Sequence, residues 1–269
     1  MKKDYSDKHT FVICAYKESA FLEECIDQTV TSTIIMVTST PCDYISNMAQ
    51  KHGIELYVND GETGISADWN FGISMAKTQY VTVAHQDDVY RRNYTVECMH
   101  AMENDRRPLI FFTNYEELRN GETCHKNKLL TVKRLMLSPL GIGTKEHRLF
   151  AHSIFIRRRI LSMGNPVCCP SVTFNMELMP EKIFTVGMKS NVDWEAWEKL
   201  SRLKGGFLYA ARPLCYHRIH QESTTSEIIA DNGRTEEDYQ MYCKFWPKWI
   251  ARFLLHWYTD SQKSNSLLD

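Results

Sequence analysis

Two adjacent carboxylates, Asp87 and Asp88, are the residues of this chain best suited to chemistry. They follow residues 80–84, whose valines and tyrosine predict a buried strand. In open α/β sheets the carboxyl ends of the strands form the ligand crevice. Two ionised carboxylates there repel each other, and a hard cation such as Mg²⁺ or Mn²⁺ supplies the counter-charge through oxygen ligands. Taken alone, the pair is also explained by a strand followed by an acidic surface loop.

The segments around this pair predict the elements that position it. Apolar runs predict strands at residues 11–16, 34–37, 54–58 and 80–84, and helical patterns lie between them. Thr40, Pro41 and Asp43 predict a helix start, and Gly53 predicts its end. Further strands are predicted at 109–113, 152–156 and 207–211, with helices over 192–203 and from 227 onward. Alternating strands and helices predict an α/β fold with a largely parallel sheet.

The bulk composition is that of an ordinary globular protein. The chain has 269 residues, of which 43% are hydrophobic and 24% charged, and its net charge of −1 gives no indication of nucleic-acid binding. We find no signal peptide and no membrane-spanning apolar run, so we expect a cytoplasmic protein. The nine cysteines include no CxxC motif, which favours free thiols.

Five segments, in this order, resemble those of a known family. They are residues 11–18, Asn70 with Gly72-Ile73 and Ala76, residues 85–88, Asp193-Trp194-Glu195, and residues 216–225. Together they resemble family 2 glycosyltransferases of the GT-A fold, of the type that assembles bacterial surface glycans. The resemblance implies a Rossmann-like GT-A domain over residues 8–225 with a mostly parallel central sheet. Residues 226–269 are then expected to form a C-terminal helical extension.

The resemblance also implies an activity and a set of site residues. A family member of this type is a metal-dependent, inverting hexosyltransferase of polysaccharide biosynthesis. It moves a sugar from a nucleotide-diphosphate donor, here a UDP-sugar, to a saccharide or lipid-linked glycan acceptor. Mn²⁺ or Mg²⁺ is expected on Asp87, Asp88 and His220, and Asp193 is expected to be the general base. The expected donor contacts are Tyr16, Glu18, Thr38, Trp69, Asn70, His85 and Arg218.

Three positions depart from the family pattern on the nucleotide side. His85 stands where the first acid of the DxD-type motif is usual, and Trp69 replaces an Arg that often precedes the helix Asn. Residues 38–41, Thr-Ser-Thr-Pro, replace an acidic segment after the second strand. These changes bear on the identity of the donor more than on the fold.

Several of these residues also have structural explanations. His85 can be a hydrogen-bonded residue at the end of a strand, and Trp69 has the spacing of a core residue. Asp193 can interact with a helix dipole, and the loop of Arg218 and His220 can be a polar surface loop. His217 alternates with Arg218 and is expected to face the other way, so we leave it out of the site.

Two other functions fit the same fold class. A sugar nucleotidyltransferase would share the metal, but such enzymes resemble one another in a Gly-rich loop after the first strand, and residues 17–20 contain no glycine. A catalytically inactive sugar-nucleotide-binding or scaffold protein is favoured by the His85 replacement and opposed by Asp87, Asp88 and Asp193.

The C-terminal segment combines an aromatic and a basic stripe. Phe245, Trp249, Phe253 and Trp257 recur every four residues, beside Lys244, Lys248 and Arg252. Pro247 suits the first turn of a new helix. Such a helix can lie on the inner face of an anionic membrane, next to a lipid-linked acceptor. It can equally pack on its own domain or across a dimer.

Overall fold

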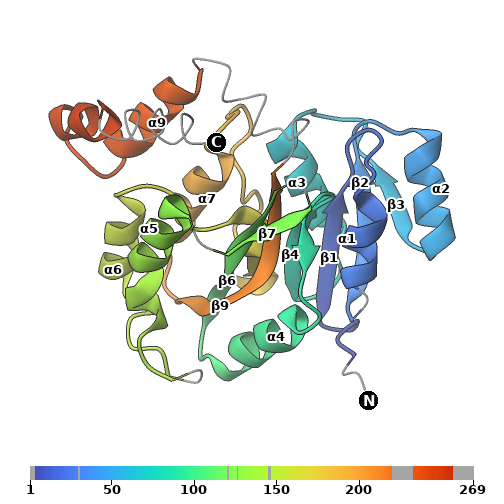
Figure 1. The fold of residues 1–269 in the computed structure, drawn as a ribbon, viewed down its shortest axis with the longest axis horizontal. Helices are drawn as coiled ribbons and strands as arrows, with labels where there is room; N and C mark the ends of the chain where they lie inside the picture. Colours follow the sequence, from blue (N-terminus) through green and yellow to red (C-terminus); the bar gives the residue numbers. More distant parts are fainter. Residues whose placement is uncertain are drawn as a thin grey trace.

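The computed structural model describes residues 4–29, 31–119, 121–125, 127–144, 147–219 and 233–256. Its centre is a nine-stranded sheet in which eight strands follow the order β3-β2-β1-β4-β8-β6-β9-β5, while β7 pairs with β6 beside this path (Figure 1). Helices cover both faces of the sheet. The predicted α/β class with a mostly parallel central sheet is therefore confirmed.

The first half of the sheet is parallel throughout, with a helix in each connection. Strand β1 pairs with β2 and β4, and β2 pairs with β3. The strands are β1 (His9–Cys14), β2 (Thr33–Thr38), β3 (Glu55–Val58) and β4 (Tyr80–His85), and the helices are α1 (Leu22–Gln28), α2 (Asp43–His52) and α3 (Ile65–Met75).

The second half of the sheet mixes directions but keeps the long strands aligned with β4. Strand β8 is antiparallel to both β4 and β6, and β9 is parallel to β6, so the carboxyl ends of β1, β4, β6 and β9 lie at one edge. The strands are β5 (Val89–Tyr90), β6 (Pro108–Arg119), β7 (Glu122–Cys124), β8 (Thr173–Asn175) and β9 (Gly206–Ile219). The helices are α4 (Tyr94–Asn104), α5 (Lys128–Leu137), α6 (Ile154–Leu161), α7 (Val192–Leu200) and α9 (Gly233–Cys243).

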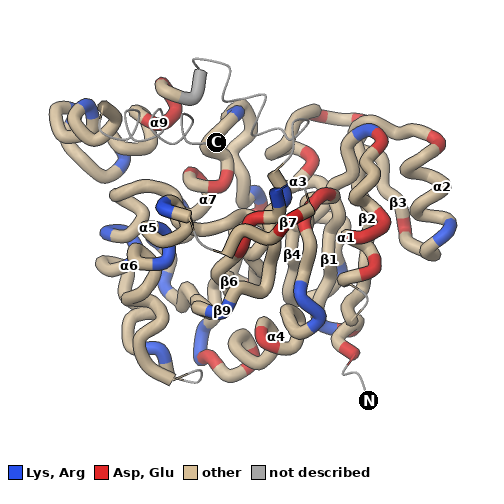
Figure 2. The backbone as a smooth tube through the Cα atoms, in the orientation of Figure 1, with Lys and Arg blue, Asp and Glu red and all other residues tan. Residues whose placement is uncertain are grey.

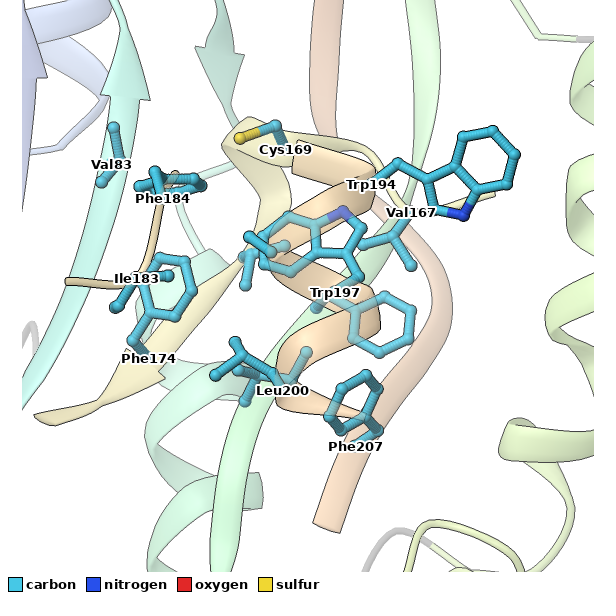
Figure 3. Packing of buried hydrophobic residues seen from close by; sticks show 14 of the residues in the cluster. Val83, Val167, Cys169, Phe174, Ile183, Phe184, Trp194, Trp197, Leu200 and Phe207 are labelled. Atoms are coloured by element: carbon cyan, nitrogen blue, oxygen red, sulfur yellow. The ribbon is translucent and has the colours of Figure 1, made fainter. Parts of the chain in front are cut away.

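Two hydrophobic clusters form the core, one on each face of the sheet. Alternate residues of β1 separate them, because Phe11 belongs to one cluster and Val12 to the other. Helices α1, α2 and α4 cover the face of Phe11, whereas α3, α5, α6 and α7 bury side chains on the face of Val12. On the latter face, Trp197 of α7 stacks on Phe174 with 5.9 Å between ring centroids (Figure 3). This packing holds α7 against the sheet.

Glycine is required where α3 crosses the sheet. A Cβ atom on Gly72 would lie 2.4 Å from Val12 Cγ1 and 3.0 Å from Val37 Cγ2. The missing side chain therefore lets α3 approach β1 and β2 closely. Gly53 ends α2 as predicted, in the left-handed conformation with φ of 63°.

The predictions fail at three places. Residues 152–156 do not form a strand but begin α6, where Ser153 accepts a hydrogen bond from the amide of Ile156 as a helix cap. Thr40 does not cap α2, which begins at Asp43 after Cys42 with no side-chain cap. Residues 114–143, whose mixed and polar sequence indicates less regular structure, contain the end of β6, then β7 and α5.

The C-terminal helices pack on α7. The ring of Tyr242 in α9 makes an edge contact with Trp194 at 5.3 Å, and the Glu237 carboxylate accepts hydrogen bonds from the amides of Lys189, Ser190 and Asn191. A second helical segment covers residues 248–256. The predicted domain boundary at residue 225 lies outside the described residues and stays a prediction. Within the described ranges, no helix has the length and apolar character needed to span a membrane.

Candidate active site

The acidic motif lies in a turn at the carboxyl end of β4, and Asp88 is its buried member. Asp88 is fully buried, and its Oδ1 accepts hydrogen bonds of 2.9 Å from His217 Nδ1 and from the amide of Arg218. Its Oδ2 lies 3.4 Å from His85 Nδ1. Asp87 is partly buried beside it. The end of β9 therefore holds the motif in place.

The two ends of the Asp88–His217 contact stabilise each other's charge. Burial alone would lower the pKa of His217, but the Asp88 carboxylate outweighs it and raises this pKa to about 9. Burial alone would likewise raise the pKa of Asp88, yet the charges of His217 and His85 and the amide of Arg218 hold it below its usual value. The pair is thus an ion pair at neutral pH.

His217, left out of the predicted site, is part of it. Strand alternation predicted that His217 and Arg218 face opposite ways. Both nevertheless contact the turn after β4, His217 through its side chain and Arg218 through its backbone amide and its guanidinium. The pairing of β5 with β9, which sets Val89 opposite Tyr216, produces this contact. Nothing local in the sequence signals it.

The Arg218 guanidinium joins β9 to α1. Its Nε donates to the Asp87 carbonyl at 2.9 Å, and a terminal nitrogen donates to Glu24 Oε2 at 2.6 Å. It also lies 4.1 Å from the centre of the Phe21 ring. Arg218 therefore supports the acidic turn from behind, and Glu24 is a further partner that sequence reasoning missed.

Trp69 and His85 stack on each other at this edge. Their ring centroids are 5.1 Å apart with an interplanar angle of 15°. Trp69 also makes an edge contact with Phe184 at 4.8 Å. Asn70 fixes this arrangement, because its side chain donates to the Phe184 carbonyl and accepts from the Phe184 amide. One ring face of Trp69 is thus used to orient His85.

The loop after β1 forms the neighbouring wall. The backbone of Tyr16 exchanges hydrogen bonds with the Gln86 side chain, and the Tyr16 side chain is 54% exposed. Lys17 adopts a left-handed φ of 53°, and its amide donates to Thr40 Oγ1. A non-glycine residue in this conformation often marks a functional site. Thr38 is buried below this loop, and Glu18 is exposed.

Asp193 is a partly buried carboxylate in the first turn of α7. It accepts hydrogen bonds from Asn165 Nδ2 at 2.6 Å and from the Trp194 amide at 2.7 Å. Burial raises its pKa above the usual value, although those two donors and the charges of Lys133 and His85 oppose the rise. Glu195 points away, toward Thr185 and Lys244.

The model of glycosyl transferase family 2 matches residues 10–170, which is more than half of the chain. This chain belongs to that family. The match extends from β1 to the turn before β8 and includes the acidic motif, so the resemblance first carried by the sequence segments is confirmed. No curated protein matches this family 2 glycosyltransferase.

Solved glycosyltransferases share the fold at low sequence identity. Residues 1–349 of TarS from S. aureus, in complex with UDP-GlcNAc, are 13% identical with a TM-score of 0.64, over 92% of this chain and 70% of TarS 1–349. The mannosyltransferase PcManGT from Pyrobaculum calidifontis, in complex with GDP-Man and Mn²⁺, is 14% identical with a TM-score of 0.58, over 93% and 70%. Glucosyl-3-phosphoglycerate synthase from Mycobacterium tuberculosis, with Mn²⁺ and UDP-glucose, is 11% identical with a TM-score of 0.57, over 88% and 79%.

The residues of the acidic motif fit a divalent cation. One ligand atom each from His85, Asp87 and Asp88 lies within 4.8 Å of the others. Within the described part of the chain, the buried atoms Asp88 Oδ2 and His85 Nε2 have no hydrogen-bond partner. A cation would coordinate their lone pairs instead. Carboxylate oxygens with one imidazole suit Mn²⁺, and carboxylates alone suit Mg²⁺. His220, the third predicted ligand, lies outside the described residues.

Proposed function

We propose that this family 2 glycosyltransferase is a metal-dependent, inverting enzyme. It moves a sugar from a UDP-sugar to a saccharide or a lipid-linked glycan, as in polysaccharide biosynthesis. The observation that carries this proposal is the set of His85, Asp87 and Asp88 at the carboxyl end of β4, which is able to bind a cation. Asp193, a partly buried carboxylate with a raised pKa, supplies a candidate base in the first turn of α7.

The donor is proposed to bind at the carboxyl ends of β1 and β4. Asp87 and Asp88 would hold the cation with His85, and a bound cation offsets the charge that develops on the leaving diphosphate. The ion pair with His217 keeps Asp88 ionised and oriented. Tyr16, Glu18 and Thr38 lie along the loops beside the motif and are proposed to contact the nucleotide. Arg218 contributes by positioning the acidic turn.

Asp193 is proposed to be the general base. The acceptor hydroxyl oxygen forms a bond to the anomeric carbon while the bond from that carbon to the diphosphate oxygen breaks. The hydroxyl proton passes to Asp193, and the electron pair leaves with the diphosphate. Hydrogen bonds from Asn165 and Trp194 fix the carboxylate, and a raised pKa makes it a better proton acceptor than a surface Asp. A single displacement inverts the anomeric centre.

The nucleotide is proposed to be uridine diphosphate. TarS and glucosyl-3-phosphoglycerate synthase were solved with UDP-sugars, and PcManGT with GDP-mannose. The two proteins solved with Mn²⁺ support a divalent cation for this chain as well. The stacked Trp69–His85 pair is proposed to lie on the nucleotide side of the site.

A panel of nucleotide sugars screened for slow hydrolysis tests the proposal without an acceptor. Release of free UDP and sugar in the presence of Mn²⁺ supports a glycosyltransferase. A sugar nucleotidyltransferase would instead consume the nucleotide sugar only with pyrophosphate and form a nucleoside triphosphate. A scaffold protein would bind UDP without turnover of any donor.

The C-terminal helix is proposed to contact a partner outside its own fold. Phe245 is partly buried against the core, but Trp249 is 74% and Phe253 is 68% exposed. Trp257, the last residue of the predicted stripe, lies outside the described residues. An inner membrane surface and a second copy of the chain both fit this exposure. Vesicle sedimentation with a chain that ends near Tyr242 separates the two.

A further inference from the structure

The charge of this chain is concentrated in one segment. Residues 128–163 contain eight Lys and Arg but a single Glu, so they carry a net charge of +7. Because the whole chain carries −1, the remaining residues carry −8. Figure 2 shows Lys and Arg without acidic residues along α5 and α6. Arg157 is buried and Arg158 pairs with Glu198, whereas Arg159 is exposed, so only part of this charge is available to attract anions.

The same segment exposes large apolar side chains. Leu135 of α5 is 73% exposed, Leu149 in the following loop 70%, and Phe155 of α6 69%. Both helices bury their other side in the hydrophobic cluster on the Val12 face of the sheet, through residues such as Leu137 and Ile160. The exposed side chains therefore point outward, and we call this surface the α5–α6 face. Exposed apolar patches rimmed by charge mark interaction sites.

A basic cavity adjoins the α5–α6 face. It has a volume of 440 Å³ and is lined by Arg106, Arg107, His152, Ile154, Lys204 and Gly205. Asp105 accepts from His152 at 2.9 Å, and Arg107 Nε donates to the Lys204 carbonyl. Ile154, which precedes Phe155, belongs to both the cavity and the face. Cationic groups thus lie next to apolar side chains that no other part of the described chain covers.

This cavity is separate from the active site. It lies where β6 begins at Pro108 and β9 begins at Gly206, while the acidic motif lies where β4 ends. Since β4, β6 and β9 run in the same direction, the two sites are at opposite edges of the sheet. The donor diphosphate therefore does not account for the cavity.

We propose that the α5–α6 face docks on an anionic phospholipid bilayer, with a lipid phosphate in the basic cavity. Leu149 and Phe155 would enter the boundary between headgroups and acyl chains, as apolar residues of interfacial helices do. Arg106, Arg107, Lys204 and Arg159, which are exposed, would meet the negative surface potential. An anionic bilayer satisfies both these exposed cations and the exposed apolar side chains, whereas a free phosphate leaves the apolar side chains in water. The proposal goes beyond sugar transfer and does not depend on it.

Sedimentation of the full chain with vesicles tests this docking. Wild-type protein is expected to bind vesicles of phosphatidylcholine mixed with phosphatidylglycerol and to bind vesicles of phosphatidylcholine alone only weakly. Added salt should release it from the mixed vesicles. The double variant Leu149→Ser/Phe155→Ser should bind at least about tenfold more weakly. Arg106→Glu/Lys204→Glu should lose the preference for phosphatidylglycerol. Both pairs are exposed, so thermal melting should stay close to wild type.

Matched controls lie on the far side of the sheet. Val58→Ser on β3 and Lys51→Glu on α2 change an exposed apolar residue and an exposed cation away from the α5–α6 face, and should bind as wild type. Asp87→Ala should also bind vesicles as wild type does, even though it is expected to lose donor turnover. Failure of vesicle docking can therefore be distinguished from failure of the proposed transferase activity.

Three results would overturn the proposal. The first is wild-type vesicle affinity in Leu149→Ser/Phe155→Ser combined with loss in Trp249→Ser/Phe253→Ser, which would assign docking to the C-terminal helix. The second is a wild-type dimer in sedimentation velocity that Phe155→Ser dissociates, without vesicle binding. The third is titratable binding of inorganic phosphate to a protein that never sediments with vesicles.

Discussion

His217 Nδ1 and Asp88 Oδ1 lie 2.9 Å apart, so the last long strand of the sheet is tied to the acidic turn after β4. The contact joins residues 129 positions apart in the chain and places a histidine that is protonated at neutral pH behind the proposed cation site. Loss of a group that orients a metal ligand in this way typically lowers metal affinity about 10- to 100-fold.

Replacing His217 by Ala is expected to weaken the response to Mn²⁺. The concentration of Mn²⁺ that gives half-maximal donor turnover should rise about 10- to 100-fold, because Asp88 loses its charged partner. Turnover at saturating Mn²⁺ should fall much less. His100→Ala, on the exposed side of α4, is the matched control. An unchanged Mn²⁺ dependence in His217→Ala would show that the ion pair is structural only.

Asp193→Asn is expected to lower kcat by about 10²- to 10⁴-fold. Donor affinity should survive, because the base acts on the acceptor. In the wild type, the base must be ionised, so activity should be full above the raised pKa of Asp193 and be lost as the pH falls through it. The measurement is kcat against pH with saturating donor and acceptor. Loss of donor affinity with unchanged kcat would make Asp193 a binding residue.

The variant Asn165→Ala provides a second test of that role. The Asn165 hydrogen bond lowers the pKa of Asp193, so its removal should raise this pKa further. The acid limb of the kcat profile should therefore move to higher pH while turnover on the plateau is largely kept. An acid limb that stays in place would assign it to another group.

His9 is expected to make stability depend on pH. It is fully buried between Ser32 and Thr82, and burial lowers its pKa to about 3. An unfolded histidine titrates near pH 6.5. Below that pH, His9 is protonated in the unfolded chain but stays neutral in the folded chain. The contribution of His9 to the free energy of unfolding is thus fully present above pH ~6.5. It is lost as the pH falls toward ~3, by at most about 1.4 kcal/mol per pH unit.

Urea unfolding of wild type and His9→Gln measures this contribution. Between about pH 6.5 and pH 5, where most carboxylates remain ionised, the variant should lose less stability than the wild type. His100→Gln should behave as wild type, because His100 is exposed. Equal slopes in wild type and His9→Gln would contradict a neutral, buried His9.

Gly72→Ala is expected to destabilise the fold. The added methyl would lie 2.4 Å from Val12 Cγ1, in a part of the core that is fully buried. Overpacking of this kind costs about 1–3 kcal/mol, more than the gain of about 0.5–1 kcal/mol from alanine in a helix. Thermal melting against Ser74→Ala, an exposed position of the same helix, checks this. An equal or higher melting temperature in Gly72→Ala would show that α3 can shift away from β1.

The sequence predicted the elements whose signals are local. The strands of residues 11–16, 34–37, 54–58 and 80–84 are short apolar runs bounded by turns, and the sheet contains all four. Residues 152–156 have the same pattern, but they form the start of a helix. A short apolar run is compatible with either a strand or a helix, and its tertiary contacts determine which one forms. Arg157 decides here, since it donates hydrogen bonds to the carbonyls of Ser201 and Gly205 from a helical position.

The environment of the site depended on contacts between distant segments. Asp87, Asp88 and Asp193 were identified from residue type, order and resemblance. The partners that tune them could not be, because Lys133, Asn165 and His217 come from α5, the segment before the Cys169–Ser171 turn, and β9. Only the sheet order brings these segments together.

Calorimetric titration with UDP, with and without Mn²⁺, tests the central claim most directly. Wild type and Asp27→Ala, an exposed carboxylate of α1, should bind UDP in a Mn²⁺-dependent manner. Asp87→Ala should lose this dependence and donor turnover, yet remain folded, because the substitution keeps the backbone carbonyl of residue 87 to which Arg218 donates. UDP binding by Asp87→Ala with wild-type affinity and wild-type Mn²⁺ dependence would contradict the proposed donor site.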